Sequence, residues 1–278
     1  MKNLQFHYHM ELEFSDQVWH HTYTLKCMPK TTTSQEITEC SVDIIPGNKV
    51  QKGTDSFGNV MLYGNVDEPH SLFSVDVRGK AQTGISRQED AGDNTDLSVY
   101  RYQTPLTRPG ERIKALHRRV TEERKAALLF KEDAGAQERR IREQVRYYME
   151  SVHENMNYTK GVTGIDTTAE EALQSGKGVC QDYAHILLSL CREERIPARY
   201  VVGMLLGEGE SHAWIEAFDG KNWIGFDPTN NLIVDDAHIK ISHGRDYQDC
   251  SINRGVFTGQ ARQKQRILVE VREEEQKA

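Results

Sequence analysis

A cysteine at the expected start of a helix is the first residue in this sequence that could do chemistry. The stretch GKGVCQDYAHILLSLC places Cys180 just after a glycine-flanked turn, and apolar residues then recur at helical spacing to Cys191, before Pro197 ends the pattern. The helix dipole favours a thiolate at this position, but by only ~0.3–2 kcal/mol. A cysteine that attacks substrates at neutral pH therefore needs a second positive neighbour, usually a histidine.

A histidine and an aspartate further along the chain could supply the partners. Residues 212–231, HAWIEAFDGKNWIGFDPTNN, read as two strands joined by Asp219-Gly220, a dipeptide typical of two-residue hairpin turns. Such a turn would set His212 directly opposite Asp227, and the Cβ atoms of opposed residues lie ~4.5–5.5 Å apart. An imidazole–carboxylate hydrogen bond is then within reach. A longer loop would change this contact into a diagonal one.

Cys180, His212 and Asp227 match in type the nucleophile, base and orienting carboxylate of a Cys-His-Asp triad. The backbone N–H of Cys180 would face the oxyanion, and Gln174, six residues earlier, is a candidate for a second oxyanion donor. Each residue alone also has a structural interpretation: a core cysteine, a satisfied strand histidine, or an aspartate in a turn before proline. The combination of residue types and spacing favours the catalytic interpretation.

The helix that precedes Cys180 has a recognisable start and end. Thr167 or Thr168 offers an N-cap with Glu170 or Glu171 three residues on, which is the capping-box pattern. We expect this short helix to end at Gly176, so that the following turn delivers the cysteine to the mouth of the next helix.

The first hundred residues are expected to form β-structure. Apolar and polar side chains alternate along residues 4–14, the mark of a half-buried strand. Further β-rich runs, separated by Gly- and Asn-containing turns, follow at residues 19–27, 37–45, 60–63 and 72–77. This pattern predicts an antiparallel sheet or sandwich.

Helix formers dominate from about residue 109, so the character of the chain changes there. Two prolines between Thr104 and Pro109 interrupt both periodicities and indicate a boundary. We therefore predict a β-rich N-terminal domain over residues 1–105 and a catalytic domain over residues 106–278. The polar, turn-rich stretch 87–97 is expected to be a surface loop.

Composition limits the classes of function. The 278 residues carry a formal net charge of −7, which argues against a nucleic-acid or anionic-membrane surface. No apolar run approaches the ~20 residues of a membrane helix, and no signal-type apolar core follows Met1, so we expect a cytoplasmic protein. The five cysteines are irregularly spaced and read as free thiols. No CxxC or HxxxH pair suggests a metal site, and no cofactor is expected.

Four motifs carry a resemblance to a known family: GVCQD, ARYVVG, SHAWIEAF and WIGFDPTNN. They resemble the transglutaminase-like cysteine hydrolase superfamily, whose core is papain-like. The similarity extends back through YTKGVTGIDTTAEEAL and forward into GRDYQDCSINRGVFTG. The N-terminal half, with DSFGN as its most recognisable piece, is similar to the β-rich region that precedes this core in a bacterial branch.

The resemblance implies an α+β fold, in which a central helix packs on an antiparallel sheet after an N-terminal β-sandwich-like domain. It also implies that Cys180, His212 and Asp227 form the catalytic triad. Trp214 and Tyr247 become candidates for substrate binding, although packing in the core is the alternative for both. For Gln181 and Asp182 we expect support of the loop rather than chemistry.

The leading hypothesis is a cysteine hydrolase, a peptidase or amidase, that cleaves an amide bond through an acyl-thioester on Cys180. By resemblance, the substrate is a peptide or protein, and we expect neither nucleic acid nor membrane as a partner; the sequence leaves the oligomeric state open. Acyl transfer to an amine by the same triad is one alternative. A non-catalytic binding scaffold on the same fold is another, and the retention of all three side chains counts against it.

Overall fold

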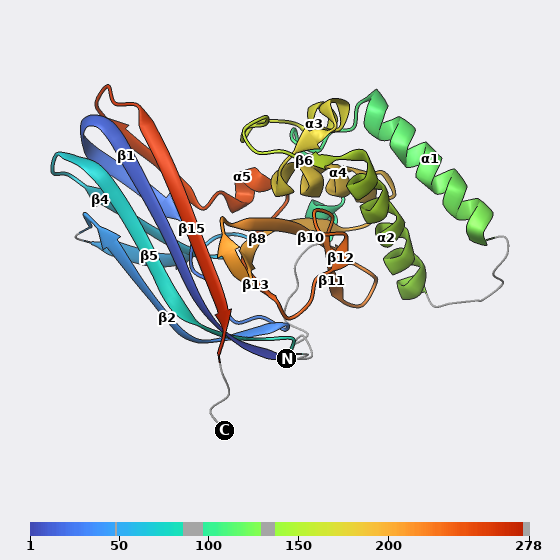
Figure 1. Ribbon diagram of the computed structural model, residues 1–278, viewed down its shortest axis with the longest axis horizontal. Coiled ribbons are helices and arrows are strands. Elements are labelled where there is room, and N and C mark those ends of the chain that lie inside the picture. Colours follow the sequence, from blue (N-terminus) through green and yellow to red (C-terminus); the bar gives the residue numbers. More distant parts are fainter. Residues whose placement is uncertain (48, 86–96, 129–136, 275–278) are drawn as a thin grey trace.

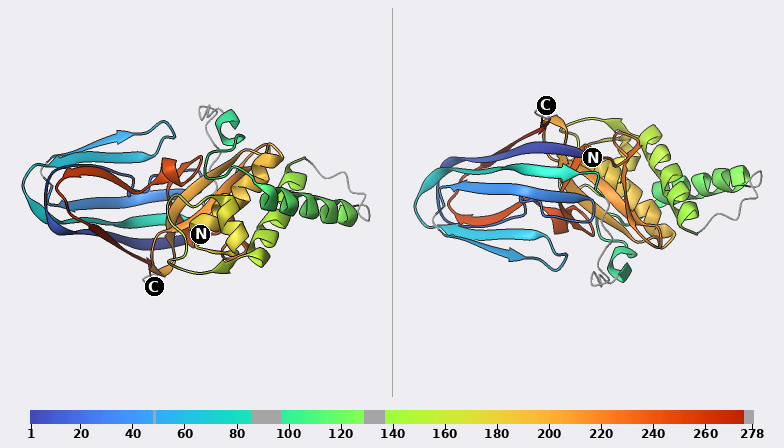
Figure 2. Two further views of the ribbon diagram at one scale, coloured as in Figure 1. Left: turned by 90° about the horizontal axis from the view of Figure 1, so that it is seen from above. Right: turned by 90° about the horizontal axis from the view of Figure 1, so that it is seen from below.

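The computed structural model describes residues 1–47, 49–85, 97–128 and 137–274. The molecule is elongated: a β-sandwich occupies one end, helices α1 and α2 occupy the other, and the strands of a second sheet lie between them (Figures 1 and 2). The expected α+β class is confirmed. No helix in the described ranges is long and apolar enough to cross a membrane.

The first layer of the sandwich is built around β1 (Lys2–Leu25). The alternation predicted for residues 4–14 is confirmed, because the even-numbered side chains from Leu4 to Phe14 are buried. This half of β1 pairs with β5 (His70–Thr83) on one side and with β15 (Gln263–Glu273) on the other. It is an interior strand whose opposite face meets solvent.

The second layer begins where β1 bends at His20 and passes from one sheet of the sandwich to the other. His20 has a positive φ of 49°, and the residues beyond it pair with β4 (Val60–Val66) and β14 (Asn253–Thr258). Tyr23 of this half packs its ring 4.8 Å from that of Phe73 on β5, so the two layers share one core. The remaining strands of the sandwich are β2 (Gln35–Ile45) beside β5 and β3 (Val50–Thr54) beside β4.

The end of the chain completes this sandwich. Strands β14 and β15 belong to the segment predicted as the catalytic domain, 106–278, yet both pair with β1. The predicted division at residues 105 and 106 therefore does not coincide with the strand pairing. The physical reason is that the buried row of β1 needs a hydrogen-bonded neighbour on each side, and β5 supplies only one.

The central part of the molecule is a five-stranded antiparallel sheet covered on one face by helices. Its order is β12-β11-β10-β8-β13, and α4 packs on β10 and β8 while α2 packs on α4. The strands are β8 (Ala198–Leu205), β10 (His212–Phe218), β11 (Trp223–Asp227), β12 (Leu232–Ile233) and β13 (His238–Gly244). The helices are α1 (Glu111–Leu128), α2 (Gln137–Asn155), α3 (Ala169–Ser175), α4 (Cys180–Glu193) and α5 (Tyr247–Cys250). Four short elements lie in the connections: η1 (Leu97–Tyr100), β6 (Asn157–Tyr158), β7 (Lys177–Gly178) and β9 (Gly207–Gly209).

The predicted capping box is present on α3. Thr168 is the N-cap and Glu171 closes the box, while Gly176 ends the helix in the left-handed region at φ 65°. Glu170 has a different partner: its carboxylate accepts the N–H groups of Gly110 and Ile113 at the start of α1. The loop predicted at residues 87–97 lies outside the described residues except for its last position.

Strand β15 offers a matched test of the sandwich. Val269 is 1% exposed and Leu268, its neighbour on the opposite face, is 52% exposed. We expect Val269→Ala to lower the free energy of unfolding by about 2 kcal/mol, because it removes buried methyl groups and leaves a cavity. Leu268→Ala should change it by less than about 0.5 kcal/mol. Urea denaturation measures both, and equal effects would contradict this architecture.

Candidate active site

Cys180 is the first residue of α4, as predicted, and its loop is fixed by Asp182. The Asp182 carboxylate accepts the N–H of Val179 and the hydroxyl of Thr163, each at 2.7 Å. Gly178 packs so closely that an added Cβ would overlap this carboxylate. The support expected of Asp182 is therefore seen directly, and Cys180 is held at a helix N-terminus.

The hairpin that carries the histidine has a four-residue loop rather than the predicted two-residue turn. Phe218 pairs with Trp223, so residues 219–222 form the loop. The cause is the Asp219 side chain, which accepts the N–H groups of Lys221 and Asn222 and closes a wider turn. Continued by one residue, this register sets Asp227 opposite Trp214 rather than opposite His212.

His212 and Asp227 nevertheless meet, across the diagonal of the hairpin. His212 Nε2 lies 2.7 Å from Asp227 Oδ2, and the Asp227 side chain is completely buried. A diagonal neighbour on the same face of a strand pair is within reach of a ring as long as imidazole. The contact predicted from the sequence is present, although the register that predicted it is wrong.

The Asp227 carboxylate is held from several directions. Backbone N–H groups of Thr229 and Asn230 donate to Oδ1, and the Asn230 side chain donates to Oδ2 at 2.7 Å. His238 Nε2 lies 3.5 Å from the same oxygen. Burial opposes ionisation, but the hydrogen bonds from His212 and His238 outweigh it and hold the pKa of Asp227 well below its usual value.

The same pair sets the charge of the imidazole. Burial disfavours the charged ring, yet the hydrogen bonds to Asp227 and Cys180 raise the pKa of His212 to about 10. Because Nε2 is bound to Asp227, Nδ1 is the ring nitrogen left for Cys180. The structure thus brings together the three side chains predicted as a triad.

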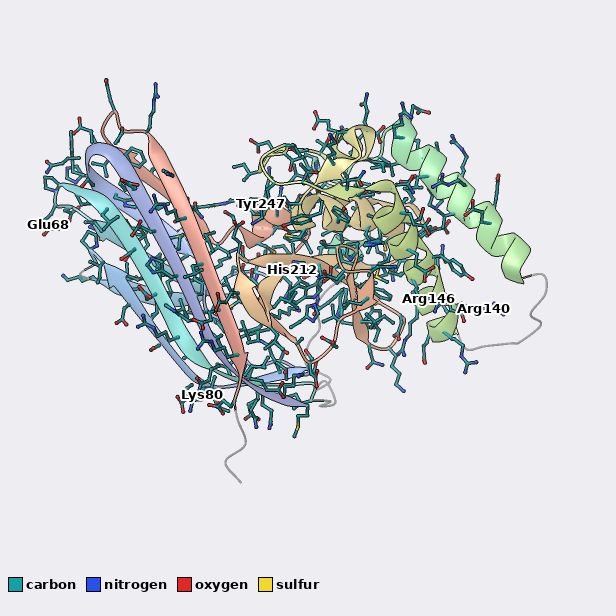
Figure 3. The ribbon with its side chains drawn as sticks, in the orientation of Figure 1. Glu68, Lys80, Arg140, Arg146, His212 and Tyr247 are labelled. Carbon is teal, nitrogen blue, oxygen red and sulfur yellow. The ribbon has the colours of Figure 1, made fainter. Side chains whose placement is uncertain are left out.

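Cys180 and His212 open into a cavity of about 380 Å³ between the helical half and the sandwich, and Asp227 lies buried behind His212. Cys180, Gln181 and His212 line one wall, with Tyr247 beside them. Figure 3 shows His212 and Tyr247 on the side of the central sheet that faces β15. Gln265 and Ile267 of β15 line the opposite wall, so the sandwich shapes the site.

Two predicted site residues lie elsewhere. Gln174 is exposed on α3 and does not line the cavity, so the structure does not bring it to the site as an oxyanion donor. Trp214 is 1% exposed and also does not line the cavity; its ring packs 6.1 Å from that of His212. Gln174 lies on α3, before the chain turns at Gly176, and Trp214 lies two residues beyond His212 on the same face of β10, deeper in the sheet. Tyr247 does line the cavity, and its part in substrate binding stays a prediction.

Two histidines were not recognised from the sequence. His238 contacts Asp227. The sequence feature that could have pointed to it is its position at the start of a strand, directly after a turn. His185 is fully buried one turn after Cys180, and its Nε2 accepts the backbone N–H of Tyr247 at 3.2 Å. Burial lowers the pKa of His185 to about 3, so the ring stays neutral and positions Tyr247 as an acceptor.

Two groups in the described ranges have the spacing of metal ligands. Within each group the ligand atoms lie no more than 4.8 Å apart. One group is His212, Asp227 and His238, whose ring nitrogens already face the carboxylate. The other is His7, His9 and Asp76 on the outer face of the sandwich. The expectation that no cofactor is needed stays a prediction.

Comparison with known proteins places the chain in a family. Residues 127–228 match the model of the transglutaminase-like superfamily, and residues 4–82 match that of the bacterial transglutaminase-like N-terminal region. The core of the chain, residues 127–228, belongs to the transglutaminase-like superfamily. The resemblance read from its motifs is confirmed. The superfamily match spans Cys180, His212 and Asp227 and ends just after the hairpin.

Two relatives and one solved structure are similar to this chain over most of its length. An uncharacterized protein of Mycobacterium leprae is 28% identical over 266 residues, 87% of this chain and 88% of the relative. An uncharacterized protein of Mycobacterium tuberculosis is 25% identical over 235 residues, 78% and 74% of the two chains. The structure of a candidate cysteine protease from Cytophaga hutchinsonii superposes with a TM-score of 0.75 at 21% identity, covering 100% of this chain and 92% of that one. It shows that the two chains share the transglutaminase-like fold.

The charge state of His212 is testable by NMR titration. Its folded pKa of about 10 exceeds the unfolded value of about 6.5, so its contribution to stability is complete below pH 6.5 and is lost as pH rises to 10. We expect the free energy of unfolding to fall across this window. Asp227→Asn should lower the His212 pKa and flatten the slope, since a neutral amide stabilises imidazolium less. An unchanged titration in Asp227→Asn would contradict the pairing.

Proposed function

We propose that this protein is a cysteine hydrolase that cleaves an amide bond in a peptide or protein through a Cys180-His212-Asp227 triad. The observation that carries the proposal is the position of His212, bonded to buried Asp227 at 2.7 Å while sharing one cavity with Cys180. The superfamily assignment and the shared fold support it. An orienting carboxylate, an imidazole and a thiol in this order form the arrangement that activates a nucleophile.

In the first half of the reaction, the Cys180 sulfur attacks the carbonyl carbon of the scissile amide. An imidazolium at His212 stabilises the thiolate, as a positive neighbour does in other reactive cysteine sites. The new C–S bond pushes the carbonyl electrons onto oxygen, and the tetrahedral anion collapses by expelling nitrogen. His212 donates its proton to the leaving amine, which departs and leaves an acyl-thioester on Cys180.

In the second half, water resolves the thioester. Neutral His212 takes a proton from water, the resulting hydroxide adds to the thioester carbon, and the C–S bond breaks. The acid product leaves and the thiolate–imidazolium pair is restored. The N–H of Cys180 lies in the first turn of α4, where backbone donors have no acceptor within the helix, so it suits the oxyanion.

Thiol reactivity separates this site from the other four cysteines. Burial raises the pKa of Cys27 and Cys191 to about 12, and it raises the pKa of Cys40 and Cys250 as well. At pH 7 we expect iodoacetamide to alkylate Cys180 at least tenfold faster than these four. Peptide mapping by mass spectrometry measures the rates.

The control for this labelling is a matched histidine. His212→Ala should abolish the advantage of Cys180, whereas His20→Ala, at a side chain 67% exposed on the sandwich, should preserve it. Equal alkylation of all five thiols in the wild-type protein would favour the non-catalytic scaffold instead.

The reaction itself is tested with a broad peptide library, incubated with and without glycine methyl ester. We expect hydrolysed products in both mixtures and none with Cys180→Ala, because the acyl group has no other carrier. His212→Ala should lower kcat/KM about 10²–10⁴-fold. Products that carry the methyl ester in place of a free acid would show acyl transfer to an amine as the main activity.

A further inference from the structure

A second cavity, of about 280 Å³, lies over the central sheet and is lined by neither Cys180 nor His212. Its floor comes from strands β8, β10, β11 and β13, and its mouth from the segment that connects β1 to β2. The lining residues are Lys30, Thr31, Thr32, Thr33, Ser34, Arg199, Glu216, Trp223, Lys240 and His243. None of them lines the candidate active site.

The charges around this cavity do not balance. Three cationic side chains line it, Lys30, Arg199 and Lys240, against the single carboxylate of Glu216. Glu216 binds both Arg199 Nε and Lys240 Nζ at 2.6 Å. Burial, reinforced by the charges of Lys240 and Arg199, holds the pKa of His243 far below its usual value, so that ring adds no charge. Two positive charges therefore remain in excess.

These charges are held away from bulk solvent. The side chains of Arg199, Lys240 and Glu216 are 9%, 7% and 12% exposed. Burial is the main cause that lowers the pKa of Lys240 to about 8, and the positive charge of Arg199 adds to it. The Glu216 carboxylate opposes this shift. An unbalanced buried cation is unfavourable unless an anion accompanies it. The cavity thus has the electrostatic character of an anion site.

Donors are available to meet such an anion. In the described part of the chain, Lys240 Nζ makes one hydrogen bond, to Glu216, and Lys30 Nζ makes one, to the carbonyl of Gly58. Each ammonium has three donors. His243 Nε2 lies 3.4 Å from Arg199 Nη1, which can only donate, so the neutral ring carries its proton on Nδ1. That nitrogen is buried and has no partner among the described residues.

The cavity is rigidly built. Gln35 exchanges two hydrogen bonds of 2.8 Å with the backbone of Lys240, and Asn59 pairs in the same way with the backbone of His243. Both amide side chains come from the N-terminal sandwich and satisfy an edge of β13. The guanidinium of Arg199 stacks 4.0 Å above the Trp223 ring. Arg199 and Lys240 are consequently held in place before any ligand arrives.

We propose that this cavity binds a phosphate group, supplied either as inorganic phosphate or as a small phosphate monoester. A phosphate carries about −1.5 to −2 charges at pH 7, which matches the two excess positive charges. Its oxygens accept hydrogen bonds from ammonium, guanidinium and hydroxyl donors. Four hydroxyl residues, 31–34, line the mouth; the outer two are exposed and the middle two half-buried. The volume lies at the lower limit of ligand pockets, so the ligand is small.

Isothermal titration calorimetry of the 278-residue protein with inorganic phosphate tests this proposal. We expect saturable binding with one site per chain. Lys30 is half-buried, and its one described hydrogen bond is to a backbone carbonyl. Lys30→Met removes one of the two excess charges and should raise the dissociation constant at least tenfold. Lys264→Met is the matched control: its exposed side chain on β15 lies outside the cavity lining and should leave binding unchanged.

Further ligands identify the anion. Competition by O-phosphoserine at comparable or higher affinity would support the proposal with a monoester as the source, and its failure to compete would support inorganic phosphate. Acetate binding as tightly as phosphate would overturn the assignment to phosphate. The absence of saturable phosphate binding, or equal affinity in the wild-type protein and Lys30→Met, would overturn the site itself. Neither result bears on the reactivity of Cys180.

Discussion

The burial of the Asp227 carboxylate is the constraint on which the candidate site depends. A carboxylate removed from water costs several kcal/mol unless hydrogen bonds replace its hydration. Here two backbone N–H groups, the Asn230 amide and the His212 ring do so. Because these bonds lie in a low-dielectric interior, they are stronger than the same bonds in water. The charge that holds His212 can therefore be buried only while these donors are in place.

The sandwich and the central sheet are bound into one structure by the two ends of the chain. The first strand, β1, pairs with the last strand, β15, and β15 also pairs with β9 beside the cavity. Gln265 and Ile267 reach the site from this strand. The walls of the cavity at Cys180 consequently come from strand β15 of the sandwich as well as from the helical half.

Local patterns in the sequence predicted much of this arrangement. The predictions that were wrong share a cause. The alternation of β1, the capping box at Thr168 and the helix start at Cys180 depend on residues close in sequence, so they could be read directly. The length of the loop after Phe218 could not be predicted in this way, because the hydrogen bonds of the Asp219 side chain decide it and not the turn preference of the Asp-Gly dipeptide. The return of β15 to β1 joins residues more than 240 positions apart, and local periodicity carries no information on such a pairing.

Trp214 explains how one strand serves two different polar networks. His212, Trp214 and Glu216 alternate along one face of β10, so the indole lies between the histidine of the candidate active site and the carboxylate of the cationic cavity. Its ring packs 5.3 Å from that of His238 and is closed off by Gly203, where an added Cβ would overlap it. An apolar ring at this position keeps water away from the His212–Asp227 bond. Gly203 and Trp214 are thus required together: a larger residue at 203 would displace the indole, and the two charged networks would lose the apolar layer between them.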